Sequence, residues 1–233
     1  MTGHHDHYQT VYDTEAERYE ALVSREDAAG ALLPALQALA PLRGVRVVEA
    51  GAGTGRLTRL IAPLATAIKA FDAAEAMLGT ARATLACHSH VELAVADHTA
   101  LPVPDGWADI ALEGWAFGHA VAWCPEGWVA LTDRYVDELL RVLRPGGTAI
   151  LIETLGTGHT EPTPPNEGLA ALYAHWEARG FHRTVLRTDY RFEHPDLARS
   201  LTQMFFRRDF DFETRADGSW LPECTGLWSL RKP

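Results

Sequence analysis

The sequence is poor in cysteine and has no long apolar segment. Its 233 residues contain only Cys87, Cys124 and Cys224, which are far apart and form no C-x-x-C pair. This spacing argues against a disulfide framework and a zinc site, and it fits a reducing cytosol. The longest apolar run, residues 31–42, is interrupted by two prolines and is too short to span a bilayer. The N-terminus lacks a basic segment followed by an apolar one, so we expect no signal peptide and a cytoplasmic location.

Positive charge is scarce as well. Lys and Arg number 21 against 31 Asp and Glu, which gives a formal net charge of -10. Nucleic-acid binding depends on Lys and Arg that neutralise phosphates, and binding to an anionic membrane surface has the same requirement. We therefore expect a small-molecule partner, no nucleic acid and no membrane. With 47% hydrophobic residues, the chain is long enough for one α/β domain with a substantial core.

Three glycines at alternate positions form the centre of the sequence pattern. Gly51, Gly53 and Gly55 follow three β-branched residues, Val45, Val47 and Val48, which are typical of a strand buried on both faces of a parallel sheet. Apolar residues at helical spacing follow over residues 57–64. Glycine permits positive φ and the close approach of a ligand, and a helix N-terminus adds unpaired N–H groups and partial positive charge. The pattern predicts a nucleotide-class site between a strand and a helix.

The spacing of these glycines differs from that of two common phosphate-binding turns. A dinucleotide turn reads G-x-G-x-x-G and a P-loop ends in G-K-S/T, whereas this chain reads G-x-G-x-G, with an acid, Glu49, two residues before the first glycine. In this motif the chain resembles the class I S-adenosylmethionine-dependent methyltransferases. Their cofactor has no phosphate, and its sulfonium and ammonium are cationic, so an acid is chemically reasonable there. The resemblance implies that the cofactor is bound by Glu49, Ala50, Gly51, Gly53, Gly55 and Arg56. The motif alone leaves open a turn without a ligand and a nicotinamide oxidoreductase.

A second acid follows the next predicted strand, residues 67–71. Asp72 lies 17 residues after Gly55, close to where dinucleotide folds place the acid that binds ribose hydroxyls. The resemblance implies the same role for Asp72, with Ala73 and Met77 beside the adenine. The alternative is an aspartate that only caps the following helix.

A third predicted strand, residues 91–96, stops at Asp97. Members of the resembled family often carry an acid here that receives the adenine amino group, which would place His98 beside the ring. The alternative is that Asp97 only opens a polar turn.

An aromatic segment follows the predicted fourth strand, residues 107–112. Ligands of open α/β sheets bind outside the carboxyl ends of the strands. The resemblance therefore implies that Glu113 and Gly114 contact the cofactor, and that Trp115 and His119 lie on the substrate side of the transferable methyl. His119 is our candidate for a general base. Packing of Trp115 in the core and capping of a helix by His119 are the alternatives.

The N-terminal residues precede the sheet pattern. We expect a frayed end over residues 1–9, which include His4, His5 and His7, and helices over residues 16–22 and 25–40. Tyr12 and Tyr19 lie about two helical turns apart and would share one face. The resemblance places such tyrosines near the methionine end of the cofactor, so residues 1–42 would act as a lid.

The C-terminal half continues the alternation of helices and strands. A helix over residues 131–143 is followed by Arg-Pro-Gly-Gly and a fifth strand at 148–152, which is another block of the resembled family. We expect a loop over residues 156–168, helices at 169–179 and 195–206, and strands at 183–190 and 227–230.

Together these blocks indicate one α/β domain over residues 1–233. The resemblance implies a Rossmann-like, doubly wound, mostly parallel seven-stranded sheet whose last strand is antiparallel. It would comprise the N-terminal helical lid (1–42), the cofactor-binding core (43–155) and a C-terminal half with a substrate-side loop (156–233). The implied function is S-adenosylmethionine-dependent methyl transfer to a small molecule by direct in-line displacement, which needs mainly proximity and alignment. A non-catalytic S-adenosylmethionine-binding or regulatory module is the alternative. No metal is expected.

Overall fold

A seven-stranded sheet forms the centre of the computed structural model, which describes residues 3–233 and their side chains from His7 onwards. The strands are β1 (Arg46–Ala50), β2 (Ala67–Asp72), β3 (Val91–Val95), β4 (Ala108–Gly114), β5 (Leu143–Thr157), β6 (His182–Arg187) and β10 (Glu223–Arg231). Their order is β3-β2-β1-β4-β5-β10-β6. β1 to β5 pair in parallel, and β10 is antiparallel to both β5 and β6. The predicted mostly parallel sheet with an antiparallel last strand is confirmed.

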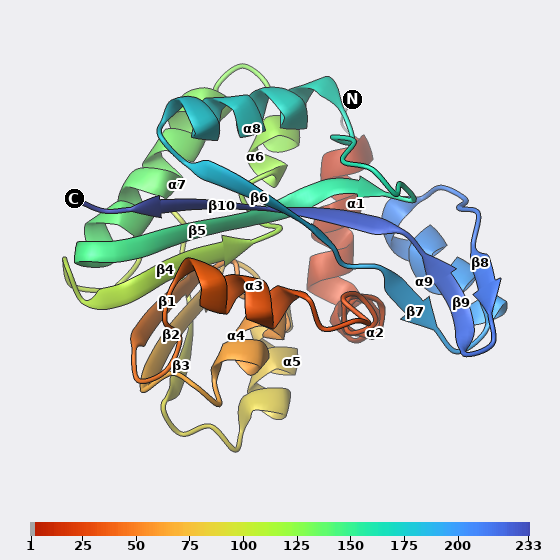
Figure 1. The fold of residues 1–233 in the computed structure, drawn as a ribbon, viewed down its shortest axis with the longest axis horizontal. Helices are drawn as coiled ribbons and strands as arrows, with labels where there is room; N and C mark the ends of the chain where they lie inside the picture. The colour runs from red at the N-terminus through yellow and green to blue at the C-terminus, as the bar shows by residue number, and fades with distance from the viewer. Residues whose placement is uncertain (1–2) are drawn as a thin grey trace.

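Helices cover both faces of this sheet (Figure 1). One face carries α3 (Leu32–Leu39), α4 (Arg56–Ile61) and α5 (Glu75–Leu85), and the other carries α6 (His119–Trp123), α7 (Trp128–Val142) and α8 (Glu167–Ala178). β1 shows how the sequence dictates this arrangement. Val47 and Val48 point to opposite faces and both are fully buried, each in a different core cluster. Two consecutive buried valines are typical of a strand that is covered on both faces.

A smaller unit lies beyond the end of the large sheet (Figure 1). It consists of α9 (Pro195–Phe206) and an antiparallel sheet of β7 (Tyr190–Phe192), β9 (Gly218–Leu221) and β8 (Glu213–Arg215). The bounds of α9 match the predicted helix, but one strand over residues 183–190 was wrong. Strand β6 ends at Arg187 because the carbonyls of Thr188 and Asp189 accept hydrogen bonds from the N–H groups of Asp27 and Ala28.

The N-terminal part differs most from expectation. Residues from Gly3 onwards form α1 (Gly3–Thr14) rather than a frayed end, and α2 (Ala16–Val23) follows. The side chains of His4 and His5 lie outside the described part. Tyr12 and Tyr19 belong to different helices, because the chain bends at Glu15 with φ -121° and ψ 25°. Their rings still meet, edge to face, with centroids 5.5 Å apart.

The predicted helix over residues 25–40 is shortened to α3 for a local reason. Asp27 has a positive φ of 59°, and its carboxylate accepts hydrogen bonds from the N–H groups of Ala31 and Leu32 at 2.7 and 3.0 Å. It therefore caps the start of α3.

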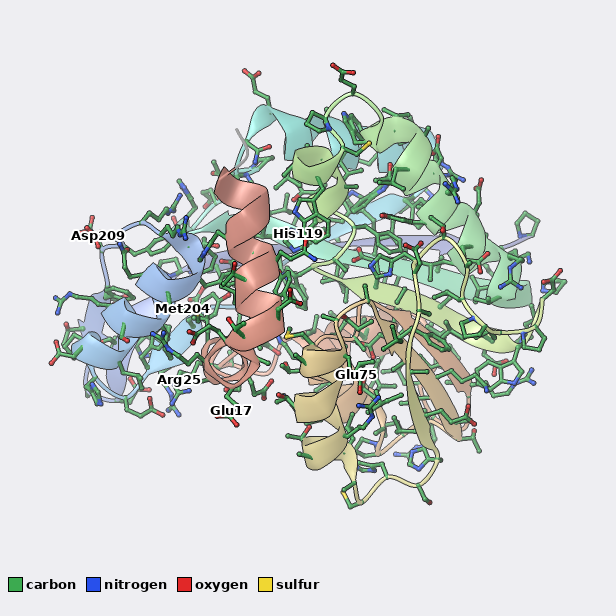
Figure 2. All side chains as sticks on the ribbon, turned by 180° about the vertical axis from the view of Figure 1, so that it is seen from behind. Glu17, Arg25, Glu75, His119, Met204 and Asp209 are labelled. Carbon is green, nitrogen blue, oxygen red and sulfur yellow. The ribbon has the colours of Figure 1, made fainter. Side chains whose placement is uncertain are left out.

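The elements around the Arg-Pro-Gly-Gly segment also have different bounds. β5 begins at Leu143 and includes this segment, whereas we expected a strand from residue 148. α6 was not predicted. Figure 2 shows α1 running between α9 and the helices α5 and α6, and α1 packs against the latter two. Within residues 3–233, no helix is long and apolar enough to cross a bilayer.

Candidate active site

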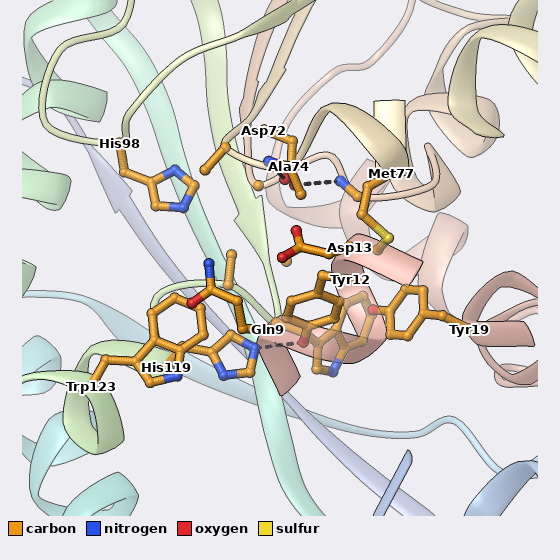
Figure 3. Close-up of a pocket in the computed structure, with 16 residues that line it drawn as sticks. Gln9, Tyr12, Asp13, Tyr19, Asp72, Ala74, Met77, His98, His119 and Trp123 are labelled. Carbon is orange, nitrogen blue, oxygen red and sulfur yellow. Dashed lines mark hydrogen bonds between the residues drawn. The ribbon is translucent and has the colours of Figure 1, made fainter. Parts of the chain in front are cut away.

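A cavity of about 150 Å³ lies at the carboxyl ends of β1, β2 and β4, beneath α1 (Figure 3). It is lined by Gln9, Tyr12, Asp13, Tyr19, Gly51, Gly53, Asp72, Ala73, Ala74, Met77, His98, Gly114, Trp115, Ala116, His119 and Trp123. Most of the residues proposed from the sequence are therefore brought together in one place. Glu49, Ala50, Gly55, Arg56, Asp97 and Glu113 do not line the cavity.

The glycine turn and Asp72 form one hydrogen-bonded unit. The N–H groups of Gly53 and Ala74 donate to the two carboxylate oxygens of Asp72, each at 2.8 Å. Gly53 has a φ of 54°, and a Cβ there would meet only the Met77 side chain, at 3.5 Å. Its backbone is consequently exposed to the cavity in a conformation that favours glycine. Each carboxylate oxygen of Asp72 keeps a lone pair that can accept a ligand hydroxyl.

The other two glycines have packing roles. A Cβ on Gly51 would lie 2.3 Å from the Cβ of Ala116, and a Cβ on Gly55 would lie 2.9 Å from Leu85. Both glycines have a positive φ, of 75° and 85°. Gly51 thus lets the segment after β4 approach the turn, and Gly55 lets α4 pack against α5.

Glu49 lies beneath the turn instead of in the cavity. It is 1% exposed, and the Thr58 hydroxyl donates a hydrogen bond to it at 2.5 Å. Burial raises the pKa of Glu49 to about 8. This hydrogen bond joins β1 to α4, so Glu49 supports the turn between them from below.

Arg56 points away from the cavity toward a buried ion pair. Its guanidinium donates to the Glu26 carboxylate at 2.7 Å and stacks on the Trp115 ring, 4.2 Å from the ring centroid. Trp115 has a positive φ of 57°, a strained value for a bulky residue. Arg56 therefore supports one wall of the cavity from behind.

Asp97 and His98 differ in orientation. The Asp97 carboxylate accepts hydrogen bonds from the Thr99 N–H at 2.7 Å and from the Thr99 hydroxyl at 2.5 Å, and these lower its pKa. His98 lines the cavity, with its ring against Phe117 and Tyr135. Burial lowers the pKa of His98, so the imidazole is neutral at pH 7, and within the described residues its buried Nδ1 has no partner. At this end of the cavity, His98 is the side chain positioned to meet a ligand.

Two buried carboxyl groups hold the segment that carries His119. Glu113 accepts hydrogen bonds from the N–H groups of Ala116 and Phe117 at 3.1 and 3.2 Å. Glu153 on β5 accepts one from the Gly118 N–H at 2.7 Å. Burial raises the pKa of both groups, to about 7 for Glu153, and repulsion between them adds to the effect on Glu113. An acid inside the apolar run of β5 was the available signal for Glu153, but the sequence reasoning missed it.

His119 begins α6 and contacts α1 at one end of the cavity (Figure 3). Its Nε2 is 2.7 Å from the hydroxyl of Tyr12. Its ring lies flat on Trp123, with centroids 4.7 Å apart and an interplanar angle of 9°. Tyr8, Tyr19 and Phe205 complete a cluster of rings around Tyr12. The cavity therefore has a polar end at Asp72 and an aromatic end at His119.

Several lining residues were not predicted, namely Gln9, Asp13, Ala74, Ala116 and Trp123. Trp123 lies four positions after His119 on α6, so its place depends on a helix that the sequence did not reveal. Gln9 and Asp13 flank Tyr12 on α1, and they would have followed from recognising residues 3–14 as a helix.

The sequence matches known methyltransferases over its central part. A family model described as a methyltransferase domain matches residues 48–151. The demethylmenaquinone methyltransferase of Clavibacter sepedonicus is 33% identical over 117 residues, which are 50% of this chain and 44% of that protein. The match thus spans less than half the length of this curated relative.

Solved structures share the fold at low sequence identity. The S-adenosylmethionine-dependent methyltransferase of Aquifex aeolicus matches with a TM-score of 0.53 and 14% identity, covering 84% of this chain and 87% of that chain. The YcgJ protein of Bacillus subtilis matches with a TM-score of 0.56 and 15% identity, covering 86% of this chain and 98% of that chain. The (4+2)-cyclase SpnF matches with a TM-score of 0.56 and 21% identity, covering 87% of this chain and 80% of that chain. These likenesses establish the fold alone.

Proposed function

We propose that the chain is a class I S-adenosylmethionine-dependent methyltransferase, as the methyltransferase-domain match over residues 48–151 suggests, and that it transfers the cofactor's methyl group to a small-molecule acceptor by direct in-line displacement. When bound, the cofactor supplies a methyl group activated by a positively charged sulfur. The protein then has to bind and align the reactants and exclude water. We further propose that it acts in the cytoplasm, without nucleic acid or a membrane as partner.

The observation that carries this proposal is the unit of Asp72 and the glycine turn. Asp72 is fixed by two backbone hydrogen bonds and keeps lone pairs for the two ribose hydroxyls. Gly53 leaves its backbone open to the methionine end, and Met77 and His98 lie where the adenine would fit. None of the described residues that line the cavity is Lys or Arg, which favours a ligand without phosphate over a dinucleotide.

The aromatic end suits the acceptor. The methyl group would lie near Gly114, between Trp115 and His119. His119 as a neutral imidazole can take a proton from the attacking group through Nε2, the atom that now meets Tyr12. The name of the Clavibacter relative supports a small organic acceptor over a macromolecule.

We propose that α1 alone forms the moving lid. α2 is attached to α4 by ion pairs of Glu20 with Arg59, at 2.5 Å, and of Glu26, just beyond α2, with Arg56, at 2.7 Å. The bend at Glu15 separates α1 from this fixed part. The cavity of about 150 Å³ is smaller than the roughly 300–1,000 Å³ of ordinary ligand pockets, so α1 has to move outward to admit the cofactor.

Calorimetric titration tests the proposed function. We expect binding of S-adenosylmethionine and S-adenosylhomocysteine, and none of NAD. Formation of S-adenosylhomocysteine with a metabolite extract would then demonstrate turnover. Binding of NAD instead of S-adenosylmethionine would refute the proposal.

The alternative is a module that binds the cofactor without turnover. It is favoured by the fold similarity to a cyclase, because the same fold then supports more than one function. Tight cofactor binding with no methylated product from any extract would select it.

A further inference from the structure

We propose that the methyl acceptor is a neutral, planar phenol, whose hydroxyl takes the place that the Tyr12 hydroxyl now occupies at His119. This inference rests on the proposed function and names the acceptor class for that site. It follows from three features of the aromatic end: the Tyr12–His119 contact, the shape of the walls and the charge of the lining.

The Tyr12–His119 contact already joins a phenol to the candidate base. The hydroxyl lies 2.7 Å from Nε2, and the two rings meet nearly at right angles, with centroids 5.6 Å apart. Burial raises the pKa of Tyr12, so its side chain is a neutral phenol at pH 7. In the tautomer whose Nε2 is unprotonated, this phenol donates its hydrogen to the imidazole. Tyr12 thus places a phenolic hydroxyl within hydrogen-bond distance of the candidate base.

The walls beside this position are flat. Trp123 lies parallel to the His119 ring, and Trp115 is held by the stacked guanidinium of Arg56. Trp123 is also 38% exposed, so one wall reaches the surface. Planar walls of this kind favour an aromatic ring, which can stack on them or meet them edge to face.

The charge of the lining favours a neutral acceptor. The described lining residues include Asp13 and Asp72 but no Lys or Arg. A carboxylate or phosphate would therefore lose its hydration without gaining hydrogen bonds from a cationic side chain. An ammonium would be repelled by the cationic sulfur of the cofactor. A phenol has an ordinary pKa of about 10, so it enters uncharged at neutral pH.

The reaction then balances within the site. The phenolic oxygen attacks the methyl carbon, the new O–CH₃ bond forms as the S–CH₃ bond breaks, and the sulfur keeps that electron pair. The phenolic proton passes to Nε2 of His119. The products are an aryl methyl ether, S-adenosylhomocysteine and a protonated imidazole, which releases its proton to water. Tyr12 has to leave Nε2 before the acceptor binds, and the outward movement of α1 would remove it.

Three probes with the same ring system test the acceptor class: 1-naphthol, 1-naphthylmethylamine, which is an ammonium at neutral pH, and 1-naphthoate. With S-adenosylmethionine, we expect the methyl ether of 1-naphthol, formed at least about tenfold faster than any product of the other two. Mass spectrometry detects the products, and NMR shows whether the methyl is on oxygen. Preferred methylation of the amine or the carboxylate would overturn the inference, as would methylation of a ring carbon.

Substitution of Tyr12 by phenylalanine gives a readout that does not depend on turnover. Tyr12→Phe keeps the ring but removes the hydroxyl that competes for His119. Calorimetry on protein saturated with S-adenosylhomocysteine should show 1-naphthol binding about 2- to 10-fold more tightly, in line with the loss of one competing neutral hydrogen bond. Tyr135→Phe, which removes a hydroxyl outside the cavity lining, should leave the affinity unchanged. Equal or weaker binding by Tyr12→Phe would overturn the inference.

Failure of the inference and failure of the proposed function are distinguishable. If the protein binds S-adenosylmethionine and methylates a compound from an extract but none of a panel of phenols, only the acceptor class is wrong. If it does not bind S-adenosylmethionine, the proposed function itself fails.

Discussion

Replacement of Asp72 by alanine should weaken cofactor binding strongly while leaving the fold intact. The structure gives this carboxylate two backbone hydrogen bonds, and its remaining lone pairs face the cavity. A hydrogen bond to a charged group contributes about 1.5–3 kcal/mol. Loss of one such bond to the ribose raises the Kd about 10- to 150-fold, because 1.4 kcal/mol corresponds to a factor of ten. Calorimetry with S-adenosylmethionine measures the change, and circular dichroism checks that the variant is folded.

Asp97→Ala is the matched control. The sequence suggested a cofactor contact for Asp97 too, but its carboxylate binds Thr99 and does not line the cavity. We therefore expect its Kd to stay within about threefold of the wild-type value, which corresponds to less than about 0.7 kcal/mol. An unchanged Kd for folded Asp72→Ala, or an equal loss in both variants, would refute the reasoning about Asp72.

Four further predictions address other parts of the site. His119→Gln should lower kcat by about 10²–10⁴ on the true acceptor with little change in cofactor Kd; a kcat within a few-fold of wild type would assign His119 to packing. Gly53→Val should abolish cofactor binding, whereas Gly44→Val, at a similar φ but in open space, should leave the Kd unchanged; equal Kd values would contradict the open-backbone role. Burial raises the pKa of Glu153 to about 7, above the unfolded value near 4.3, so the folded state binds its proton more tightly and loses stability as pH rises between these values. Urea unfolding of Glu153→Gln should therefore show a smaller loss of stability from pH 5 to pH 8 than wild type, and an identical loss would count against a buried, protonated Glu153. Cofactor binding should slow hydrogen exchange in α1 but leave α2 nearly unchanged, and equal slowing of both would argue against a hinge at Glu15.

The parts of the site that depend on local sequence could be predicted. A β-branched strand, a glycine turn and the acid after the next strand fix one another through short-range geometry, so Gly51, Gly53 and Asp72 were found on the cavity. The mostly parallel sheet was implied by the resemblance, and it agrees with the helices that follow β1 and β2, because parallel strands need crossover connections that are usually helices.

Side-chain direction could not be read in the same way. Arg56 and Asp97 were sensible candidates by position, yet each side chain forms hydrogen bonds with another residue of the protein. Arg56 donates to Glu26, and Asp97 accepts from Thr99. The Glu26 contact spans 30 positions and depends on how the segment after α2 lies against α4. No periodicity in the sequence contains that information.

The aromatic end depended on backbone features that sequence patterns describe poorly. The bend at Glu15 places Tyr12 and Tyr19 on two helices, and the short helix α6 places Trp123 beside His119. Glu153 reaches Gly118 from a strand 35 positions away. Contacts of this range arise from tertiary packing, which overrides local preference.

The most direct test of the account is transfer of an isotopically labelled methyl group. Purified protein is incubated with S-adenosylmethionine labelled in the methyl group and a metabolite extract, and mass spectrometry follows the label. We predict a labelled small-molecule product and an equal amount of S-adenosylhomocysteine, both strongly reduced in Asp72→Ala and His119→Gln. A folded protein that binds the cofactor but transfers no label to any acceptor would contradict the proposed function.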